Sequence, residues 1–399
     1  MSSVYAELLS LESQGICLGL ERIRPLLAAL GNPERAARRT VIITGTNGKG
    51  SVAATLSRAL RAAGVRVGLY TSPHLVSVLE RIRLADQDLD AQTFDRLGVR
   101  VLEAIRATGA RASFFEALTA MAYLAFAEAG VDTQVIEVGV GGGRDATHAA
   151  EPTHAVITSV GKDHAALIGP TLDDIVREKL GALGAASENV LALPPRYQAL
   201  APPSWLVGRD VRCRAAGGRL LVDLPGEHLE LPLPRLVGAH QERNAALAVA
   251  MGRRLGLPPG ALAEALQSVR WRARLERLAG EPPTFVDGAH NPAGIRALLI
   301  ALPRVGLEPG FTLVFGAHPK KDAGPMLRSL ASVAGRVVLT EAPLLRPAAG
   351  LTRCLPGRGA LVEPDPLAAL ALARSFGAPV LVAGSLYLAG ELLGRLEAS

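Results

Sequence analysis

Cysteine and long apolar runs are both scarce in this chain of 399 residues. The three cysteines are far apart and show no Cys-x-x-Cys spacing: Cys17, Cys213 and Cys354. This distribution supports neither a zinc site nor a disulfide framework, so we expect reduced thiols in the core. No stretch reaches the roughly 18 consecutive apolar residues of a membrane-spanning helix. Acidic residues near the N-terminus argue against a signal peptide. We therefore expect a soluble cytoplasmic protein without membrane attachment.

Aromatic residues and lysine are also rare, and both facts bear on the partners. The formal net charge is +6, but the basic residues are scattered and aromatic residues make up only 4% of the chain. Stacking platforms for nucleic acid are therefore few, and we expect anionic small molecules instead. Of the 43 lysines and arginines, the lysines are Lys49, Lys162, Lys179, Lys320 and Lys321. A lysine that persists in such a chain suggests a need for a compact or titratable amine, which arginine cannot supply.

The order of apolar segments predicts an α/β fold with a mostly parallel sheet, because strands alternate with helices. The chain is longer than one hydrophobic core usually serves, so we expect two domains, residues 1–271 and the smaller 272–399. Within the first, the Pro- and Gly-rich residues 186–236 predict a peripheral, strand-rich insertion. The second domain restarts the alternation of strands and helices in a Rossmann-like α/β pattern.

The individual elements follow from hydrophobic periodicity and turn residues. The expected strands are residues 40–44, 65–74, 133–140, 154–161, 284–287, 311–315, 336–340 and 379–384. After an N-terminal helical segment, the expected helices are residues 50–63, 91–107, 114–129, 171–183, 238–255, 259–269, 292–302, 322–333 and 365–375.

Residues 45–51, Gly-Thr-Asn-Gly-Lys-Gly-Ser, lie between a predicted strand and a predicted helix, and we call them the phosphate loop. Backbone N–H groups and a helix N-terminus converge on an anion at such a junction. The glycines permit close approach, Lys49 can reach the β- and γ-phosphates of a nucleotide, and Ser51 can offer its hydroxyl to Mg²⁺. Unusually, Gly50 separates Lys49 from Ser51. The alternative, an ordinary glycine-rich turn, does not explain the retained lysine.

Polar side chains lie at the ends of two predicted strands, at the edge where ligands bind in an open parallel sheet. Glu137 comes before a glycine-rich turn, and His164 follows the next strand along the chain. Oxygen ligands suit Mg²⁺ better than histidine does, so Asp163 is a rival to His164. From the residues alone, Glu137 could instead be a buried hydrogen-bond acceptor, and His164 a surface residue.

Other candidates have plain structural alternatives. Lys179 lies near the C-terminal end of a predicted helix, where a lysine complements the helix dipole. In the second half, Asp287, His290 and Asn291 cluster between a strand and a helix. Arginines near the domain boundary, at positions 272, 274 and 277, could bind phosphate or carboxylate, or could form a solvated basic face.

Taken together, the motifs resemble those of the folylpolyglutamate synthase and dihydrofolate synthase family, the folate branch of the Mur ligases. The matching stretches span nearly the whole chain: GLERI (19–23), TGTNGKGSV (44–52), TSPHL (71–75), FFEALT (114–119), IEVGVGGGRDAT (136–147), SVGKDH (159–164), EKLG (178–181), HQERNAALA (240–248), RLE (274–276), VDGAHNP (286–292) and GSLYLAGE (384–391). The resemblance implies a P-loop domain of Mur ligase type followed by an α/β domain that contributes ATP and glutamate contacts.

The resemblance also implies a reaction. ATP phosphorylates a carboxylate of dihydropteroate or folate, and L-glutamate then attacks the acyl phosphate to form an amide. The expected cofactors are ATP and Mg²⁺, with a monovalent cation as a further candidate, and the expected state is a monomer. We expect a bifunctional dihydrofolate and folylpolyglutamate synthase. The alternatives are a monofunctional folylpolyglutamate synthase, a Mur-type ligase of cell-wall precursors and a nucleotide-binding switch without ligase activity.

The resemblance assigns roles to individual residues of this chain, although the chain departs from the family pattern at Arg272-Ala273, His148 and Lys162. The resemblance implies metal ligands at Ser51, Glu137, His164 and Lys179, with Lys179 carbamylated, and catalytic roles for Lys49, His164 and Lys179. The implied ATP contacts are Thr46, Asn47, Gly48, Lys49, Gly50, Ser51, Asn244, Arg274, Asp287 and His290. The implied substrate contacts are Ser72, Pro73, His74, Phe115, Gly384 and Ser385.

Overall fold

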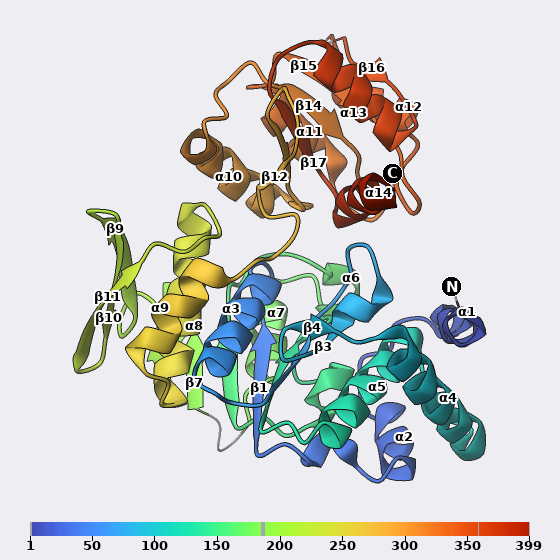
Figure 1. The fold of residues 1–399 in the computed structure, drawn as a ribbon, viewed down its shortest axis with the longest axis vertical. Coiled ribbons are helices and arrows are strands. Elements are labelled where there is room, and N and C mark those ends of the chain that lie inside the picture. The colour runs from blue at the N-terminus through green and yellow to red at the C-terminus, as the bar shows by residue number, and fades with distance from the viewer. Residues whose placement is uncertain (1, 185–187, 358, 399) are drawn as a thin grey trace. The chain divides into compact units, whose positions relative to one another are not determined.

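The computed structural model describes residues 2–184, 188–357 and 359–398, which form two compact units (Figure 1). The first unit comprises residues 1–74, 79–235 and 242–269, and the second comprises residues 75–78, 236–241 and 270–399. Residues 186 and 187 of the expected insertion lie outside the described residues. No helix in the described part of the chain combines the length and apolarity needed to cross a bilayer.

The first unit is built on an eight-stranded sheet with the order β4-β3-β2-β5-β1-β6-β7-β8. Its strands are β1 (Arg39–Thr44), β2 (Val67–Tyr70), β3 (Ile82–Leu84), β4 (Gln87–Asp88), β5 (Thr133–Glu137), β6 (His154–Ile157), β7 (Glu188–Leu191) and β8 (Trp205–Leu206). Neighbouring strands are parallel except where β3 pairs with β2 and with β4. β1 lies between β5 and β6, so its C-terminal end reaches the middle of the sheet edge.

The expected strand at residues 65–74 is too long, because β2 ends at Tyr70. The Thr71 N–H bonds to the Arg81 carbonyl instead of continuing the pairing with β5. Pro73 has no N–H for a ladder, which also favours the early end. The chain therefore leaves the sheet just before the TSPHL stretch.

Helices cover the sheet of the first unit. The helices that lie wholly or mostly in this unit are α1 (Ser3–Ser10), α2 (Ile23–Ala29), α3 (Lys49–Ala62), α4 (Ala91–Thr108), α5 (Phe114–Glu128), α6 (Ala165–Ile168), α7 (Leu172–Leu180), α8 (Ala239–Arg254) and α9 (Pro259–Ser268). α5 is apolar on nearly all sides and almost wholly buried, as such a composition requires. A capping box fixes its start, because Ser113 and Glu116 each accept a backbone hydrogen bond from the other.

The insertion expected at residues 186–236 is partly wrong, because β7 and β8 extend the main sheet in parallel. The remainder forms a separate antiparallel sheet of β9 (Arg212–Ala216), β10 (Arg219–Leu224) and β11 (Glu227–Pro232). In β10, residues alternate between buried and more exposed positions, and one face of this sheet packs on α9. β7 is a short buried strand, and no turn residues mark where the main sheet ends and the insertion begins, so the sequence did not show that β7 belongs to the main sheet.

The second unit has a six-stranded sheet with the order β12-β13-β17-β14-β15-β16. Its strands are β12 (Glu276–Leu278), β13 (Thr284–Val286), β14 (Thr312–Phe315), β15 (Arg336–Leu339), β16 (Leu361–Val362) and β17 (Val380–Ala383). Its helices are α10 (Pro292–Ala301), α11 (Ala323–Ala331), α12 (Ala348–Leu351), α13 (Pro366–Ser375) and α14 (Leu386–Ala398). Only β12 runs antiparallel to its neighbour. β12, β16, α12 and α14 were not predicted.

Candidate active site

Two glycines let the phosphate loop adopt a conformation that other residues would block. Gly45 has φ 147°, and a Cβ there would lie 1.9 Å from the Thr158 Oγ1 atom. Gly48 has φ 91°, and a Cβ there would lie 2.4 Å from the Asn244 Oδ1 atom. Both angles fall in the region that favours glycine. The second contact also places Asn244 of α8 directly against the loop.

Hydrogen bonds to the segment after β6 hold the phosphate loop in place. The Asn47 carbonyl accepts bonds from Thr158 Oγ1 at 2.7 Å and Ser159 Oγ at 2.9 Å. The Asn47 N–H donates to Ser159 Oγ at 2.9 Å, and the Thr46 N–H donates to the Ser159 carbonyl at 3.0 Å. The loop is therefore fixed before any anion arrives, which lowers the entropy cost of binding.

The N-terminus of α3 gives the phosphate loop a partial positive charge. Gly48 caps this helix of 14 residues, so the first N–H groups of the helix lie at the loop. Lys49 Nζ donates to the Gly45 carbonyl at 3.1 Å, and an ammonium has two further hydrogens for an anion. These groups suit a polyphosphate.

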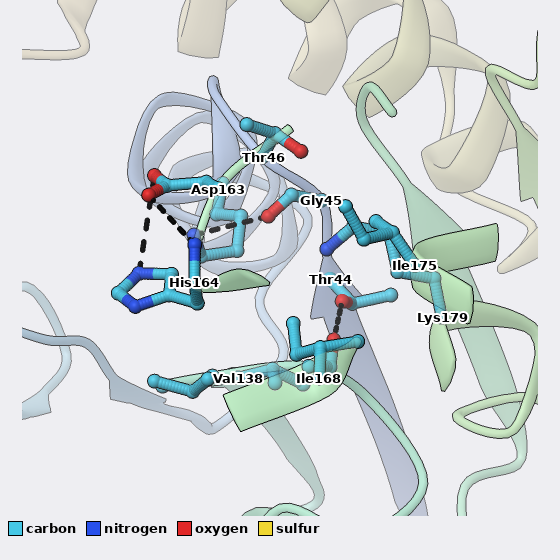
Figure 2. A pocket seen from close by; sticks show the side chains of 13 residues that line it. Thr44, Gly45, Thr46, Val138, Asp163, His164, Ile168, Ile175 and Lys179 are labelled. Atoms are coloured by element: carbon cyan, nitrogen blue, oxygen red, sulfur yellow. Dashed lines mark hydrogen bonds and ion pairs between the residues drawn. The ribbon is translucent and has the colours of Figure 1, made fainter. Parts of the chain in front are cut away.

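A pocket lies beside the phosphate loop, and its lining comes from three parts of the first unit (Figure 2). The residues come from the loop region, from the turn after β5, and from the segment that runs from the end of β6 through α7: Thr44, Gly45, Thr46, Lys49, Val138, Gly139, Val140, Gly141, Asp163, His164, Ile168, Ile175 and Lys179. The pocket thus brings together Lys49, His164 and Lys179, which lie far apart in the sequence.

Ser51 and Glu137 have the properties that a cation site requires. Ser51 is 1% exposed, and its buried Oγ atom has no hydrogen-bond partner among the described residues. A buried hydroxyl left without a partner is costly, and a metal ion would satisfy it. Glu137 is 5% exposed at the end of β5, where it pairs with Ile43 of β1, and its Oε2 atom accepts a bond from the Ser72 N–H at 3.2 Å. This donor set fits Mg²⁺.

His164 occupies a more open position than Glu137. Its side chain is 42% exposed, while that of Asp163 is 15% exposed. The His164 backbone is left-handed with φ 51°, and its N–H donates to Asp163 Oδ1 at 2.9 Å. Because both side chains line the pocket, Asp163 stays a rival ligand. Within the described residues, no three histidine, cysteine, aspartate or glutamate side chains form a metal site by themselves.

Lys179 points into the protein, so complementing the helix dipole does not account for its position. It is 3% exposed on α7, and in Figure 2 its side chain reaches toward the phosphate loop. Burial, with the nearby charge of Lys49, lowers the pKa of Lys179 to about 7, although Asp163 and Glu178 oppose the shift. Close approach of α7 depends on Gly142, where a Cβ would lie 2.1 Å from the Glu178 carbonyl. Near neutral pH, a large fraction of this amine is uncharged.

The TSPHL stretch lies next to Glu137 through the Ser72 bond described above. Pro73 is exposed, and His74 Nδ1 accepts a bond from Arg81 Nε at 2.9 Å. The Phe115 ring lies against Gly139, where a Cβ would come within 2.6 Å of it. The first unit therefore gathers these expected substrate residues at the edge that carries Glu137.

The second unit has its own cluster at the carboxyl ends of β13 and β17. Asp287 is buried, and its carboxylate accepts bonds from the Leu275 N–H at 3.0 Å and the Ala289 N–H at 2.8 Å. Burial raises the pKa of Asp287, although the Arg274 charge opposes that shift. Ala273 and Leu275, on either side of Arg274, have φ 53° and 47°. Such angles are strained in residues other than glycine, and strain of this kind is common at functional sites.

The other expected residues of the second unit lie in the same cluster. His290 Nδ1 is 2.9 Å from the Gly288 carbonyl, and the Gly384 N–H donates to the Ala289 carbonyl at 3.1 Å. Ser385 is buried, and its Oγ atom accepts a bond from the Tyr387 N–H. Asn291 caps α10. By contrast, the Arg277 side chain is 62% exposed, which fits the solvated alternative for that residue.

Sequence reasoning missed three residues that support the site. Thr158 and Ser159 anchor the phosphate loop, and Arg81 holds His74. The SVGKDH motif marked the neighbourhood of Ser159 without indicating its bonds. Nothing in the sequence indicates a role for Arg81, because its contact with His74 forms only when the two ends of the loop between β2 and β3 come together.

The folds and motifs of both units define a Mur ligase. A family model described as the Mur ligase middle domain matches residues 43–193, and one described as the Mur ligase glutamate ligase domain matches residues 273–386. The first match contains the phosphate loop and Lys179. The second contains Arg274, Asp287 and Ser385.

Similar proteins narrow this class to one family. Folylpolyglutamate synthase of Lacticaseibacillus casei is 34% identical over an alignment of 407 positions, gaps included, which covers 93% of this chain and 92% of the relative. The structure of Escherichia coli FolC in complex with DHPP and ADP covers 100% of this chain and 98% of its own, at 29% identity and a TM-score of 0.90. A bifunctional folylpolyglutamate synthase/dihydrofolate synthase from Yersinia pestis, complexed with AMPPNP and Mn ion, gives 28% identity and a TM-score of 0.88, and covers 100% of this chain and 98% of its own. The chain belongs to the folylpolyglutamate synthase/dihydrofolate synthase family.

The packing of Gly45 predicts a loss of nucleotide binding on substitution. Gly45→Ala places a methyl group against Thr158 in a backbone conformation that alanine rarely adopts. We expect the loop to shift and the affinity for ATP, measured by titration calorimetry, to fall at least about tenfold.

Gly161→Ala is the matched control, because a Cβ there meets nothing closer than 3.7 Å and its φ is ordinary. ATP affinity should stay within about twofold of the wild type. Equal affinities for Gly45→Ala and Gly161→Ala, with both variants folded, would contradict the assigned role of the loop.

Proposed function

We propose that this protein is an ATP-dependent amide ligase that adds L-glutamate to dihydropteroate and to folates. The observation that carries the proposal is the preformed phosphate loop beside a buried serine hydroxyl that has no partner among the described residues. Membership of the family supplies the substrates, since the names of the relatives refer to dihydrofolate and folylpolyglutamate synthesis. On this proposal, one protein performs both reactions.

Amide formation requires an activated carboxylate, because an attacking amine cannot readily displace an oxygen atom from an unactivated carboxylate. A carboxylate oxygen of the pterin-linked acid attacks the γ-phosphorus of ATP, and the bond to the β-phosphate oxygen breaks to release ADP. The glutamate amine then attacks the acyl carbon, loses a proton, and displaces inorganic phosphate. The phosphate loop and Lys49 stabilise the charge that moves in the first step.

Ser51, Glu137 and His164 are the residues that would hold Mg²⁺ in this protein. When bound, the ion neutralises phosphate charge during the transfer. Thr46, Asn47, Gly48 and Gly50 provide backbone groups for the phosphates, and Asn244 lies against Gly48. The proposed ATP contacts from the second unit are Arg274, Asp287 and His290.

The proposed contacts with the substrates divide between two clusters. Ser72, Pro73, His74 and Phe115 would contact the pterin-linked acid, and their location beside Glu137 supports this role. Gly384 and Ser385 would contact glutamate, and the cluster around Asp287 supports this role. A monovalent cation, a monomeric state and a cytoplasmic location stay predictions.

Lys179 is proposed to react with carbon dioxide to form a carbamate, in which the amine nitrogen bonds to the carbon atom and releases one proton to solvent. Only the neutral amine adds to carbon dioxide, and burial beside Lys49 favours that form. The product is an anion that would pair with Lys49 and offer oxygen atoms to the metal ion. Arginine could not undergo this reaction at neutral pH.

A ligation assay tests the proposed function. Purified protein with ATP, Mg²⁺ and glutamate should release ADP and yield a glutamylated product, identified by mass, with dihydropteroate and separately with tetrahydrofolate. Product from only one acceptor would remove the bifunctional claim. Turnover with UDP-linked muramoyl acids alone, or ATP binding without glutamate-dependent turnover, would contradict the assignment.

Lys179→Ala tests the carbamate. We expect ligase activity to fall at least about a hundredfold, because the charge near Lys49 and the metal is lost. Short carboxylic acids should restore part of the activity by supplying the missing carboxylate.

Lys162→Ala is the matched control, since Lys162 is exposed in the segment before α6, and its activity should stay close to that of the wild type. Full activity of Lys179→Ala would exclude an essential role for Lys179.

A further inference from the structure

His74 and Arg81 form a pair at the base of the loop that joins β2 to β3. Arg81 Nε donates to His74 Nδ1 at 2.9 Å. The Thr71 N–H also donates to the Arg81 carbonyl at 2.9 Å, so the backbone closes at the same point. The pair therefore has a defined geometry although the loop between its members is long.

Arg81 is buried among uncharged groups. It is 8% exposed, and its guanidinium lies 5.3 Å from the centre of the Phe114 ring. The Tyr70 hydroxyl, whose pKa burial raises to about 12, also lies near this guanidinium. Burying a positive charge beside neutral partners is costly, although the ring face recovers part of the energy. An arginine that only improved solubility would lie at the surface, so the burial of Arg81 indicates a different role.

The chemistry of the two side chains fixes the state of His74. A guanidinium has only donors and keeps its proton at all accessible pH values. His74 Nδ1 must therefore accept, which leaves the ring hydrogen on Nε2. Protonation of His74 would place two N–H groups and two positive charges against each other. Consistent with this geometry, burial together with the Arg81 charge lowers the pKa of His74 to about 4.

The Nε2–H group of His74 is a donor without a protein acceptor in the described part of the chain. The side chain is half-buried, and Arg81 is its only hydrogen-bond partner there. The Ser72 N–H bonds to Glu137, which connects this loop to the sheet edge beside the phosphate loop. The donor thus belongs to the part of the first unit where the acid to be activated would lie.

We propose that Arg81 is a positioning residue that fixes His74 as the Nε2–H tautomer, so that His74 donates a hydrogen bond to an acceptor atom of the pterin-linked acid. The identity of that ligand rests on the proposed function, whereas the tautomer does not. An acid that presents a carbonyl, carboxylate or ring-nitrogen lone pair to the His74 Nε2–H group accepts this hydrogen bond and is bound. An analogue with an N–H group there meets a donor and is rejected.

Magnetic resonance tests the tautomer directly in the full-length protein. His74→Gln assigns the His74 signals in ¹⁵N-histidine-labelled protein. We expect Nε2 to carry the hydrogen, with no titration between about pH 5.5 and 8. Among the described residues, the Tyr5 and Tyr70 phenols also lie near Arg81, and burial raises their pKa values, so they stay neutral in this range. In Arg81→Met, the pKa of His74 should rise above its wild-type value because the Arg81 charge is lost, while burial still holds it below the ordinary value of about 6.5.

Two results of this experiment would overturn the proposal. One is a wild-type His74 that carries its hydrogen on Nδ1 or titrates near its ordinary pKa. The other is a folded Arg81→Met variant in which the His74 spectrum and titration are unchanged. Neither measurement depends on ligase activity, so a protein that fails as a ligase would still test this inference.

Kinetics test the link from Arg81 to the substrate. Arg81→Met should raise KM for the pterin-linked acid about tenfold and leave KM for ATP within about twofold. Arg81→Lys, which keeps a charged donor, should recover part of the loss.

His74→Gln keeps an N–H donor and should retain more affinity for this acid than His74→Leu. Equal increases in both KM values on Arg81→Met, or equal effects of glutamine and leucine at position 74, would show a merely structural role and contradict the proposal.

Discussion

The site depends on one constraint: the backbone of residues 45–51 must come close to phosphate and remain fixed there. Glycine at positions 45 and 48 makes the required angles accessible, and Thr158 and Asn244 fill the space that a side chain would need. Ser159 Oγ then holds Asn47 on both sides, because it accepts a bond from the Asn47 N–H and donates one to the Asn47 carbonyl. β1 lies between β5 and β6, so the loop, Glu137 and the segment after β6 meet at one edge.

Charge at that edge is arranged for an anion. Lys49 and Lys179 repel each other within one pocket, which helps to lower the pKa of Lys179. Polyphosphate or a carbamate would relieve this repulsion, and Ser51 and Glu137 supply oxygen atoms for a cation. His74 adds a neutral donor, because Arg81 prevents it from becoming another positive charge. At both His74 and Lys179, burial and a neighbouring positive charge together lower the pKa and favour the neutral side chain.

Local patterns predicted the central strands and the phosphate loop, whereas most roles of the clustered residues came from the resemblance to the family. Glycine spacing identified Gly45 and Gly48, and the apolar run of residues 40–44 became β1. The sequence did not predict that β7 joins the main sheet, since a short buried run carries no sign of its partner. The inward direction of Lys179 depends on Gly142 packing against α7, and the role of Arg81 depends on a closed loop. Both are contacts between distant segments, which spacing cannot reveal.

The central claim is that the phosphate loop holds ATP so that its γ-phosphate transfers to a carboxylate of the pterin-linked acid. A direct measurement uses an acid whose carboxylate carries ¹⁸O, with product phosphate analysed by mass after turnover with ATP and glutamate. Transfer through an acyl phosphate predicts that one labelled oxygen from the carboxylate appears in the released phosphate. Amide formation with unlabelled phosphate would contradict the account.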